Sequence, residues 1–240
     1  MKRLAVLLMF VLLCVGADSP IDYEDYKAIR AAAQKGDPNA QYNMGVMYDK
    51  GYKVKQDSKE AMKWYKKAAA QNYPEAQYNI GVSYETGAGV KQDYKEAAKW
   101  YRRAADNGLM FAQYNLGVLY NDGKGVKQSY SQAMKWYMKA AEQGDSSAQY
   151  NIGVLYDEGK GVKQNYAEAV KWYKLAAEQG VPSAQYNLGT MYVKGEGVEV
   201  DYSEAEKYYS LAAEQGHEEA AVALAELRRQ LNNIGGTNDE

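Results

Sequence analysis

Hydrophobic and small residues recur along most of this chain with the spacing of amphipathic helices. In residues 57–70, alanines, a tryptophan and a second aromatic residue fall on one side of a helical wheel, and three lysines fall on the other. In residues 38–50, Ala40, Met44 and Tyr48 form an apolar side, with Gly45 at its edge. The pattern predicts two packed helices joined by a short turn.

This pair of helices repeats with a period of 36 residues. The tetrapeptide Ala-Gln-Tyr-Asn stands at 40–43, 76–79, 112–115, 148–151 and 184–187, and glycine, tyrosine and tryptophan positions keep the same step. Complete units are expected at 37–72, 73–108, 109–144, 145–180 and 181–216, after an N-terminal half unit at 22–36. A capping helix at 217–232 and a disordered tail at 233–240 are expected to follow. Such a period is typical of a repeat array.

The expected helix ends carry recognisable signals. Each second helix begins with a capping box, in which the first side chain accepts from a backbone N–H and the second reaches back to the N–H of the first residue. These boxes start at Asp57, Asp93, Ser129, Asn165 and Asp201. Glycines follow most helices, as expected where the next residue is left-handed. A Gly-x-Gly-Val turn joins the two helices, interrupted by Lys53 in the first copy.

A glycine inside each first helix, as at Gly45 and Gly117, indicates close helix packing. Such a glycine costs about 1 kcal/mol relative to alanine, so its repetition favours a neighbouring helix that approaches closely. In the last helix Ala225 replaces this glycine and Arg228 replaces the tyrosine three residues later. A capping helix with a polar outer face is therefore expected.

The N-terminus has the pattern of a secretory signal peptide. A basic start is followed by twelve apolar residues and the small-residue sequence Val15-Gly16-Ala17. We therefore expect residues 1–17 to be removed after Ala17 and the protein to be secreted or periplasmic, without a stable membrane span. A lipid anchor at Cys14 is the alternative, although Leu13 replaces the small residue that such a signal requires.

Composition narrows the classes of function. Net charge is −2, with both signs mixed along the chain, which disfavours a nucleic-acid partner. Cleavage would also remove Cys14, the single cysteine, so the mature chain would lack thiols and disulfides. The 24 tyrosines against 2 phenylalanines reflect the repeated unit.

The repeated unit has the pattern A-x-x-x-[LIM]-G-x-x-Y-x-x-G-x-G-V…A-x-x-W-x-x-A-A. This pattern resembles the Sel1-like repeat, a relative of the tetratricopeptide repeat. The resemblance covers roughly residues 22–230. It implies an all-α, right-handed solenoid of antiparallel helix pairs whose first helices line a concave groove, and a protein-binding adaptor. Some cysteine-rich relatives are linked to penicillin binding and β-lactam hydrolysis, which leaves a hydrolase as an alternative. A structural scaffold for envelope assembly is another.

The tyrosine and asparagine of the tetrapeptide, with a valine three residues later, lie away from the packed side of the wheel. The groove of units two to four is therefore expected to bind a protein or peptide segment, with an Asn amide donating to and accepting from a peptide backbone. The predicted binding residues are Tyr78, Asn79, Val82, Tyr114, Asn115, Val118, Tyr150, Asn151 and Val154. Alternatively, the asparagines hydrogen-bond one helix to another. The tyrosine series at 48, 65 and 94 are expected to serve packing.

Residues that differ between units are expected to give selectivity, because they break the repeated pattern. They are Asp49, Glu85, Asn121, Asp157 and Val193. Lysines in the turn form a separate basic stripe that is either solvated or faces an acidic partner: Lys55, Lys91, Lys127 and Lys163.

Nothing in the sequence indicates catalysis. The sole histidine, His217, lies at the start of the last helix, where a surface position is expected rather than a catalytic one. No metal-ligand cluster and no Ser-x-x-Lys motif stand in the sequence. We expect no cofactor, no metal and no enzymatic activity, and a monomer is the simplest expectation.

Overall fold

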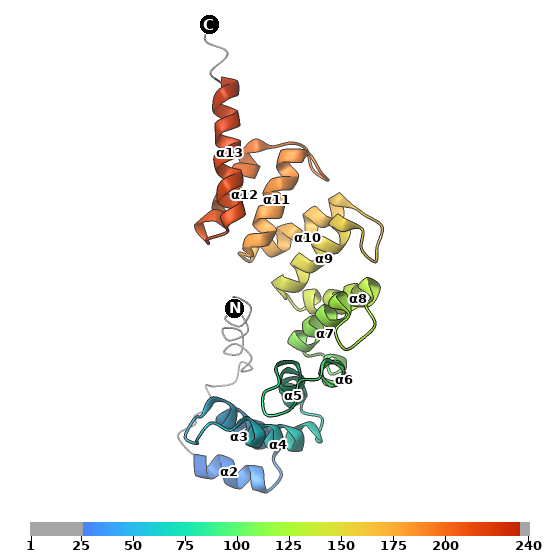
Figure 1. Cartoon of the computed structure of the whole chain (residues 1–240), viewed down its shortest axis with the longest axis vertical. Helices are drawn as coiled ribbons and strands as arrows, with labels where there is room; N and C mark the ends of the chain where they lie inside the picture. Colours follow the sequence, from blue (N-terminus) through green and yellow to red (C-terminus); the bar gives the residue numbers. More distant parts are fainter. Residues whose placement is uncertain (1–25, 236–240) are drawn as a thin grey trace. The chain divides into compact units, whose positions relative to one another are not determined.

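A computed structural model describes residues 26–235, which form twelve α-helices and no strand (Figure 1). The helices are α2 Tyr26–Gln34, α3 Pro38–Lys50, α4 Ser58–Ala69, α5 Pro74–Thr86, α6 Tyr94–Asp106, α7 Met110–Asp122, α8 Tyr130–Glu142, α9 Ser146–Glu158, α10 Tyr166–Glu178, α11 Pro182–Lys194, α12 Tyr202–Glu214 and α13 Glu218–Gly235. The expected all-α array of helix pairs is confirmed. The predicted signal peptide, its cleavage site and Cys14 lie outside the described residues.

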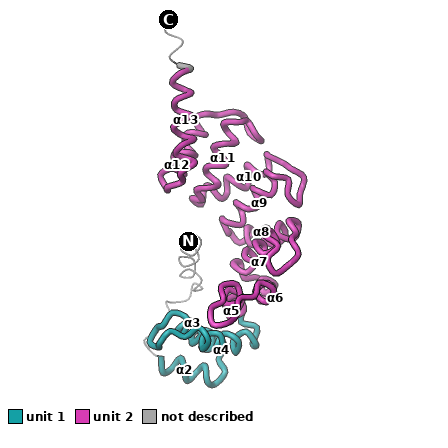
Figure 2. The backbone as a smooth tube through the Cα atoms, in the orientation of Figure 1, with its two compact units in different colours: residues 1–73 teal, residues 74–240 magenta. Residues whose placement is uncertain are grey.

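The helices belong to two compact units, residues 1–73 and 74–240 (Figure 2). The first contains α2 to α4, and the second contains α5 to α13. Within each unit, the two helices of a repeat share a larger interface than either shares with the next repeat. None of the helices in residues 26–235 combines the length and the apolar composition that crossing a bilayer requires.

The second helices begin at the predicted caps, but only half of each capping box forms. The carboxylate of Asp93 accepts from the backbone N–H of Glu96 at 3.1 Å. The reciprocal bond from the Glu96 side chain to the Asp93 N–H was predicted wrongly. That N–H donates instead to the carbonyl oxygen of Tyr84 at 2.8 Å, and the Glu96 carboxylate pairs with Lys99. The N–H of the cap residue therefore ties the second helix to the first.

The glycine inside each first helix faces a buried tyrosine of the second helix, as the close-packing prediction required. A Cβ added to Gly117 would lie 2.6 Å from ring carbons of Tyr137, a side chain that is 2% exposed. The same arrangement joins Gly153 to Tyr173. These tyrosines fill the space between the two helices of a repeat, and the glycine leaves room for the ring.

The second glycine of the Gly-x-Gly-Val turn meets the preceding repeat. Gly161 has a φ of +73°, and a Cβ there would lie 2.6 Å from Cβ of Tyr130 and 2.7 Å from its carbonyl carbon. Gly125 and Gly197 approach the first residues of α6 and α10 in the same way. These three turns therefore pack their backbone directly on the start of the previous second helix, where only glycine fits.

The last helix is longer and less polar than expected. It runs to Gly235, so residues 233–235 are helical rather than part of a tail, and residues 236–240 lie outside the described residues. Leu227 is buried against α12. The outward side carries charged residues but also Ala221, Val222 and Ala225, all exposed. Its outer face is therefore mixed rather than uniformly polar.

Candidate functional site

The nine predicted binding residues lie on α5, α7 and α9, the first helices of repeats two to four. All nine are intermediate in exposure, neither buried nor fully exposed. In each helix the tyrosine and asparagine are adjacent, and the valine follows three residues after the asparagine, so the three share one side of the helix. The second unit therefore presents three equivalent, partly accessible sets of side chains.

Each tyrosine of this face leans on the buried tyrosine of its own second helix. The ring centroids of Tyr114 and Tyr137 are 5.9 Å apart and the planes are tilted by 37°. Tyr78 and Tyr150 have the same relation to Tyr101 and Tyr173, at 5.6 and 5.8 Å. Contacts of this tilted kind are favourable for aromatic rings and fix the orientation of the half-exposed ring.

One of the three predicted asparagines, Asn115, connects its repeat to the repeat before it. Asn115 Nδ2 donates to the hydroxyl oxygen of Tyr78 over a long 3.4 Å. Asn187, one repeat beyond the predicted residues, lies beside the hydroxyls of Tyr150 and Tyr173 and opposes the rise that burial causes in the pKa of each tyrosine. Asn115 therefore bridges α7 and α5. The Asn115 side chain is nevertheless intermediate in exposure and not buried.

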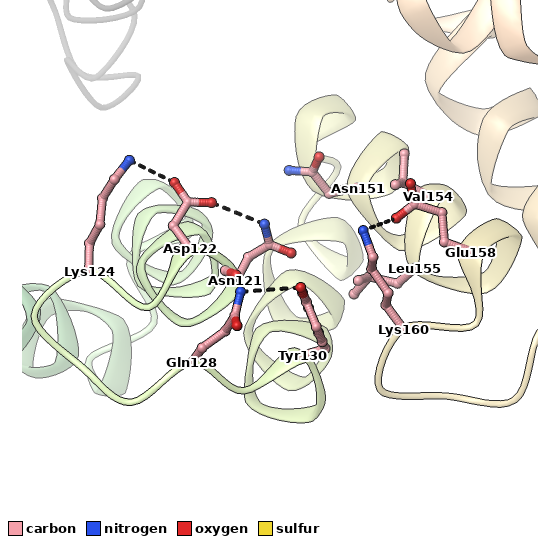
Figure 3. Close-up of a pocket in the computed structure, with 10 residues that line it drawn as sticks. All are labelled: Asn121, Asp122, Lys124, Gln128, Tyr130, Asn151, Val154, Leu155, Glu158 and Lys160. Atoms are coloured by element: carbon pink, nitrogen blue, oxygen red, sulfur yellow. Dashed lines mark hydrogen bonds and ion pairs between the residues drawn. The ribbon is translucent and has the colours of Figure 1, made fainter.

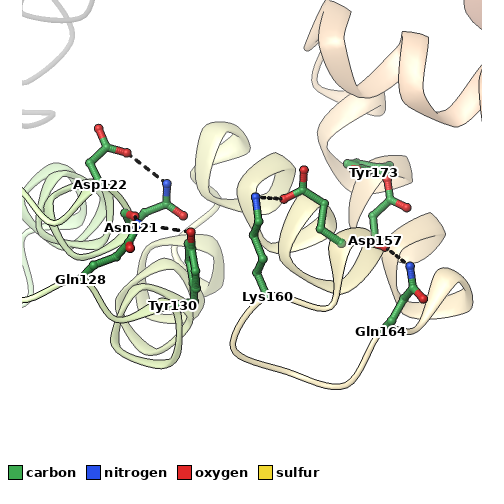
Figure 4. Close-up of polar contacts among 9 residues, drawn as sticks. Asn121, Asp122, Gln128, Tyr130, Asp157, Lys160, Gln164 and Tyr173 are labelled. Atoms are coloured by element: carbon green, nitrogen blue, oxygen red, sulfur yellow. Dashed lines mark hydrogen bonds and ion pairs between the residues drawn. The ribbon is translucent and has the colours of Figure 1, made fainter.

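Two of the predicted selectivity residues accept hydrogen bonds from buried tyrosines. The Tyr173 hydroxyl donates to Oδ2 of Asp157 at 3.1 Å (Figure 4), and Tyr101 donates to Glu85 in the same way. Burial raises the pKa of Tyr173 well above its ordinary value, and the Asp157 carboxylate adds to the shift. Burial also raises the pKa of Asp157, while the bond from Tyr173 opposes that rise. These carboxylates therefore anchor buried tyrosines.

An open hollow of about 530 Å³ lies where repeats three and four meet (Figure 3). Two predicted binding residues, Asn151 and Val154, contribute to its wall. The remaining lining comes from helix ends and turns: Asn121, Asp122, Lys124, Gln128, Tyr130, Leu155, Glu158 and Lys160. Ion pairs at 2.8 Å between Lys124 and Asp122 and at 2.7 Å between Lys160 and Glu158 balance its charges. The hollow is polar and has no net charge.

The glutamine of the tetrapeptide is a structural residue that the sequence analysis missed. Gln113 is 4% exposed, its Nε2 donates to the carbonyl of Ala105 at 3.2 Å, and its Oε1 accepts from Gln143 at 2.8 Å. One buried amide thus ties a first helix to the ends of both flanking second helices. Its recurrence, with a second amide residue 30 positions later, is the signal that would have revealed it. The buried members are Gln41, Gln77, Gln113, Gln149 and Gln185.

The remaining candidates from the sequence are the lysines of the basic stripe and His217. Lys91, Lys127 and Lys163 of the basic stripe are exposed. His217 stacks on Tyr186 with centroids 5.0 Å apart, and its Nδ1 accepts from the N–H of Ala220 at 3.3 Å. The histidine therefore caps α13. Within residues 26–235, no group of three or more metal-ligating side chains comes together.

Comparison with known proteins identifies the repeated unit. A family model for the Sel1 repeat matches residues 38–73, 74–109, 111–145, 146–181 and 182–217. Proteins built from this repeat generally mediate protein–protein interactions and are typically non-enzymatic scaffolds. A search of curated protein sequences returned no match.

Three solved structures are similar to the chain. A protective antigen of uropathogenic Escherichia coli, described as having an SLR fold, has a TM-score of 0.84 and 39% identity over 90% of this chain and 46% of its own. This chain thus spans less than half the length of that relative. A Sel1 repeat protein from Oxalobacter formigenes has a TM-score of 0.75 and 39% identity, over 80% of this chain and 83% of its own. An immunity protein from Pseudomonas aeruginosa shares the fold alone, at a TM-score of 0.50 and 20% identity over 91% of this chain and 81% of its own.

Proposed function

This chain belongs to the Sel1 repeat family, and from that membership we propose that it is an exported adaptor that binds a segment of a partner protein. The partner lies along the first helices of repeats two to four, in contact with the nine tyrosine, asparagine and valine residues of α5, α7 and α9. The signal-peptide pattern in residues 1–17 supports a secreted or periplasmic location.

The observation that carries the proposal is the threefold recurrence of one half-exposed set of side chains beside an open hollow. A tyrosine offers rigid apolar area with a polar tip at low entropic cost, which suits contact with many sequences. An asparagine amide can pair with a peptide N–H and a peptide C=O at once. Because Asn151 and Val154 also line the hollow, a bound segment can continue from the helix faces into it.

Equivalent contacts along several repeats favour a ligand that is recognised mainly through its backbone. Sites that repeat at a constant step bind a regular or extended segment, and each contributes a small part of the affinity. Selectivity then depends on residues that differ between repeats. Glu85, Asn121 and Asp157 occupy one such position, and only the two carboxylates among them are tied to a buried tyrosine.

Replacing Asn79, Asn115 and Asn151 together by alanine should strongly weaken partner binding while the protein stays folded. Ligand hydrogen bonds of this kind contribute about 0.5–1.5 kcal/mol each, so the loss of three weakens binding substantially. Circular dichroism and thermal melting report the fold, and recovery of the crosslinked partner from cells reports binding.

A matched control replaces Lys99, Lys135 and Lys171, exposed residues of the second helices, by alanine. The control should keep both fold and partner. A lower melting temperature with the partner retained would assign the asparagines to helix bridging alone. A triple variant that keeps its stability and its partner would exclude both roles.

A further inference from the structure

We propose that the bound segment carries a bulky apolar side chain that lies against Phe111 and Tyr78, and a neighbouring basic side chain that faces Glu75. This inference rests on the proposed binding face of α5, α7 and α9 and names the chemistry of the partner that the face selects. Phe111 determines the apolar preference, and Glu75 determines the basic one.

The binding side of α7 begins with an aromatic residue in the first turn of the helix. Phe111 stands four residues before Asn115 and seven before Val118, so the three side chains follow one line along the helix. Phe111 is intermediate in exposure, like the nine residues of the binding face. Its ring is therefore partly accessible to a segment that lies on that face.

Phe111 interrupts the repeated pattern. The 36-residue register places Ser147 and Ser183 at the same position of α9 and α11. Phe111 is also the only phenylalanine in residues 26–235. Because α9 and α11 pack in their repeats with a small serine at this position, the ring of Phe111 is not required by the packing that the repeats share.

The Phe111 ring extends the aromatic surface of the preceding repeat. Its centroid lies 6.4 Å from that of Tyr78, with the ring planes tilted by 46°. Tyr78 also contacts the buried ring of Tyr101, at 5.6 Å, which holds it in place. Two partly accessible rings from consecutive repeats thus form one apolar patch, the Tyr78–Phe111 pair. Aromatic side chains of this kind are enriched where proteins contact each other.

The equivalent place two repeats later is polar. Burial raises the pKa of Tyr150, and Asn187 and then Ser183, both beside its hydroxyl, oppose that rise. The binding face therefore carries an apolar patch between repeats two and three, where the register gives serines to the repeats that follow. A bulky apolar side chain is removed from water best on the Tyr78–Phe111 pair, which fixes the position of the segment along the array.

A carboxylate stands at the matching position of the helix before. Glu75 lies four residues before Asn79 on α5 and is intermediate in exposure. Among residues 26–235 its carboxylate makes no ion pair and no hydrogen bond. By contrast, Asp122 and Glu158, the last residues of α7 and α9, are paired with lysines. A basic side chain of the partner supplies the missing opposite charge.

The two preferences together give the segment a direction. Glu75 and Phe111 stand on successive first helices, so a segment that satisfies both must present its basic and its apolar side chain in that order along the array. Charges arranged in this way contribute more to the choice and orientation of a partner than to raw affinity.

Random dodecapeptides displayed on phage test these preferences with the whole chain. Peptides that bind the unmodified protein, and that the folded Asn79, Asn115 and Asn151 triple variant no longer retains, identify binding at the proposed face. Such peptides should share a bulky apolar residue and a lysine or arginine at a constant spacing, because the two contacts are made to fixed positions.

Single substitutions test each contact with one selected peptide, by fluorescence anisotropy. Phe111→Ser introduces the residue of the next two repeats and should weaken binding about tenfold or more, as loss of an interface anchor does. Phe111→Tyr keeps a ring and should bind like the unmodified protein. Glu75→Gln should weaken the same peptide, but should not weaken a version whose basic residue is replaced by glutamine.

A double variant moves the ring by one repeat. With Phe111→Ser and Ser147→Phe in one chain, the apolar patch lies between repeats three and four, while Glu75 stays in place. Peptides selected on this variant should have a longer spacing between the basic and the apolar residue. A purely structural role of Phe111 predicts a changed melting temperature and an unchanged spacing, so the selection separates recognition from folding.

Failure of the binding face and failure of the partner chemistry give different results. If no selected peptide depends on the three asparagines, the proposed binding face is wrong, and the preference is wrong with it. Peptides that depend on the asparagines but share no apolar and basic residue would overturn the preference alone. So would equal binding to Phe111→Ser and the unmodified protein, or an unchanged spacing in the double variant.

Discussion

Replacing Gly161 by alanine should lower the free energy of unfolding by about 2–5 kcal/mol. A left-handed conformation costs a non-glycine residue about 1–2 kcal/mol, and overpacking adds about 1–3 kcal/mol. Both terms apply, because φ is +73° and the new Cβ would lie 2.6 Å from Cβ of Tyr130. The neighbouring atoms belong to the backbone and Cβ of α8, which cannot move aside by a change of rotamer.

Gly180→Ala is the matched control in the same repeat. Gly180 has a φ of +82°, and no atom lies within 4 Å of a Cβ added there. It should lose only the conformational part, about 1–2 kcal/mol. Chemical denaturation of both variants measures the difference. Equal losses would show that the turn does not pack on the preceding repeat.

Gly117→Leu should destabilise the protein by about 1–3 kcal/mol or more through overpacking against Tyr137. Gly117→Ala is the more informative test, because whether alanine raises or lowers the free energy of unfolding depends on the space around the added Cβ. At an open position in a helix, alanine stabilises by about 1 kcal/mol relative to glycine. Here the added Cβ would lie 2.6 Å from the buried ring, so a net loss is expected.

A double variant separates this contact from other effects of the glycine. Tyr137→Ile alone should destabilise the core, since the ring is 2% exposed. Combined with Gly117→Ala, the total loss should be smaller than the sum of the two single losses, because the smaller side chain makes room for the Cβ. Thermal melting of the four proteins completes the cycle. A stabilising Gly117→Ala would show that this glycine does not face the ring.

The repeat period and the helix ends could be predicted from the sequence because their signals are local. The cap at Asp93 and the left-handed glycine at Gly123 each act within one turn of a helix. The same signals recur in the other copies of the repeat, which strengthens the prediction. The glycine inside each first helix was also informative, since its cost has no local compensation.

The contacts between helices could not be predicted in the same way, because they depend on which groups meet in space. The Asp93 N–H was expected to donate to the Glu96 side chain, whereas in the structure it donates to the carbonyl oxygen of Tyr84. Gln113 gave no local signal of burial, since a glutamine is usually exposed and becomes a core residue only when its amide is satisfied by two other helices.

The candidate site could be predicted only in part from the sequence. The helical wheel placed Tyr114, Asn115 and Val118 away from the packed side of α7. All three are intermediate in exposure, but Tyr114 and Val118 also pack against the core. The wheel could not show that Asn115 reaches Tyr78 of the preceding repeat, because that contact joins residues 37 positions apart. Glu85 likewise looked like a free groove charge, although it accepts from Tyr101.

Site-specific photocrosslinking in intact cells tests the binding face most directly. A photoreactive residue replaces Tyr114 on α7 in one version of the protein and Lys135, an exposed residue of α8 in the same repeat, in another. The adaptor proposal predicts a discrete protein adduct from position 114 and none from position 135. An adduct of equal or greater yield from position 135, or none from position 114, would contradict it.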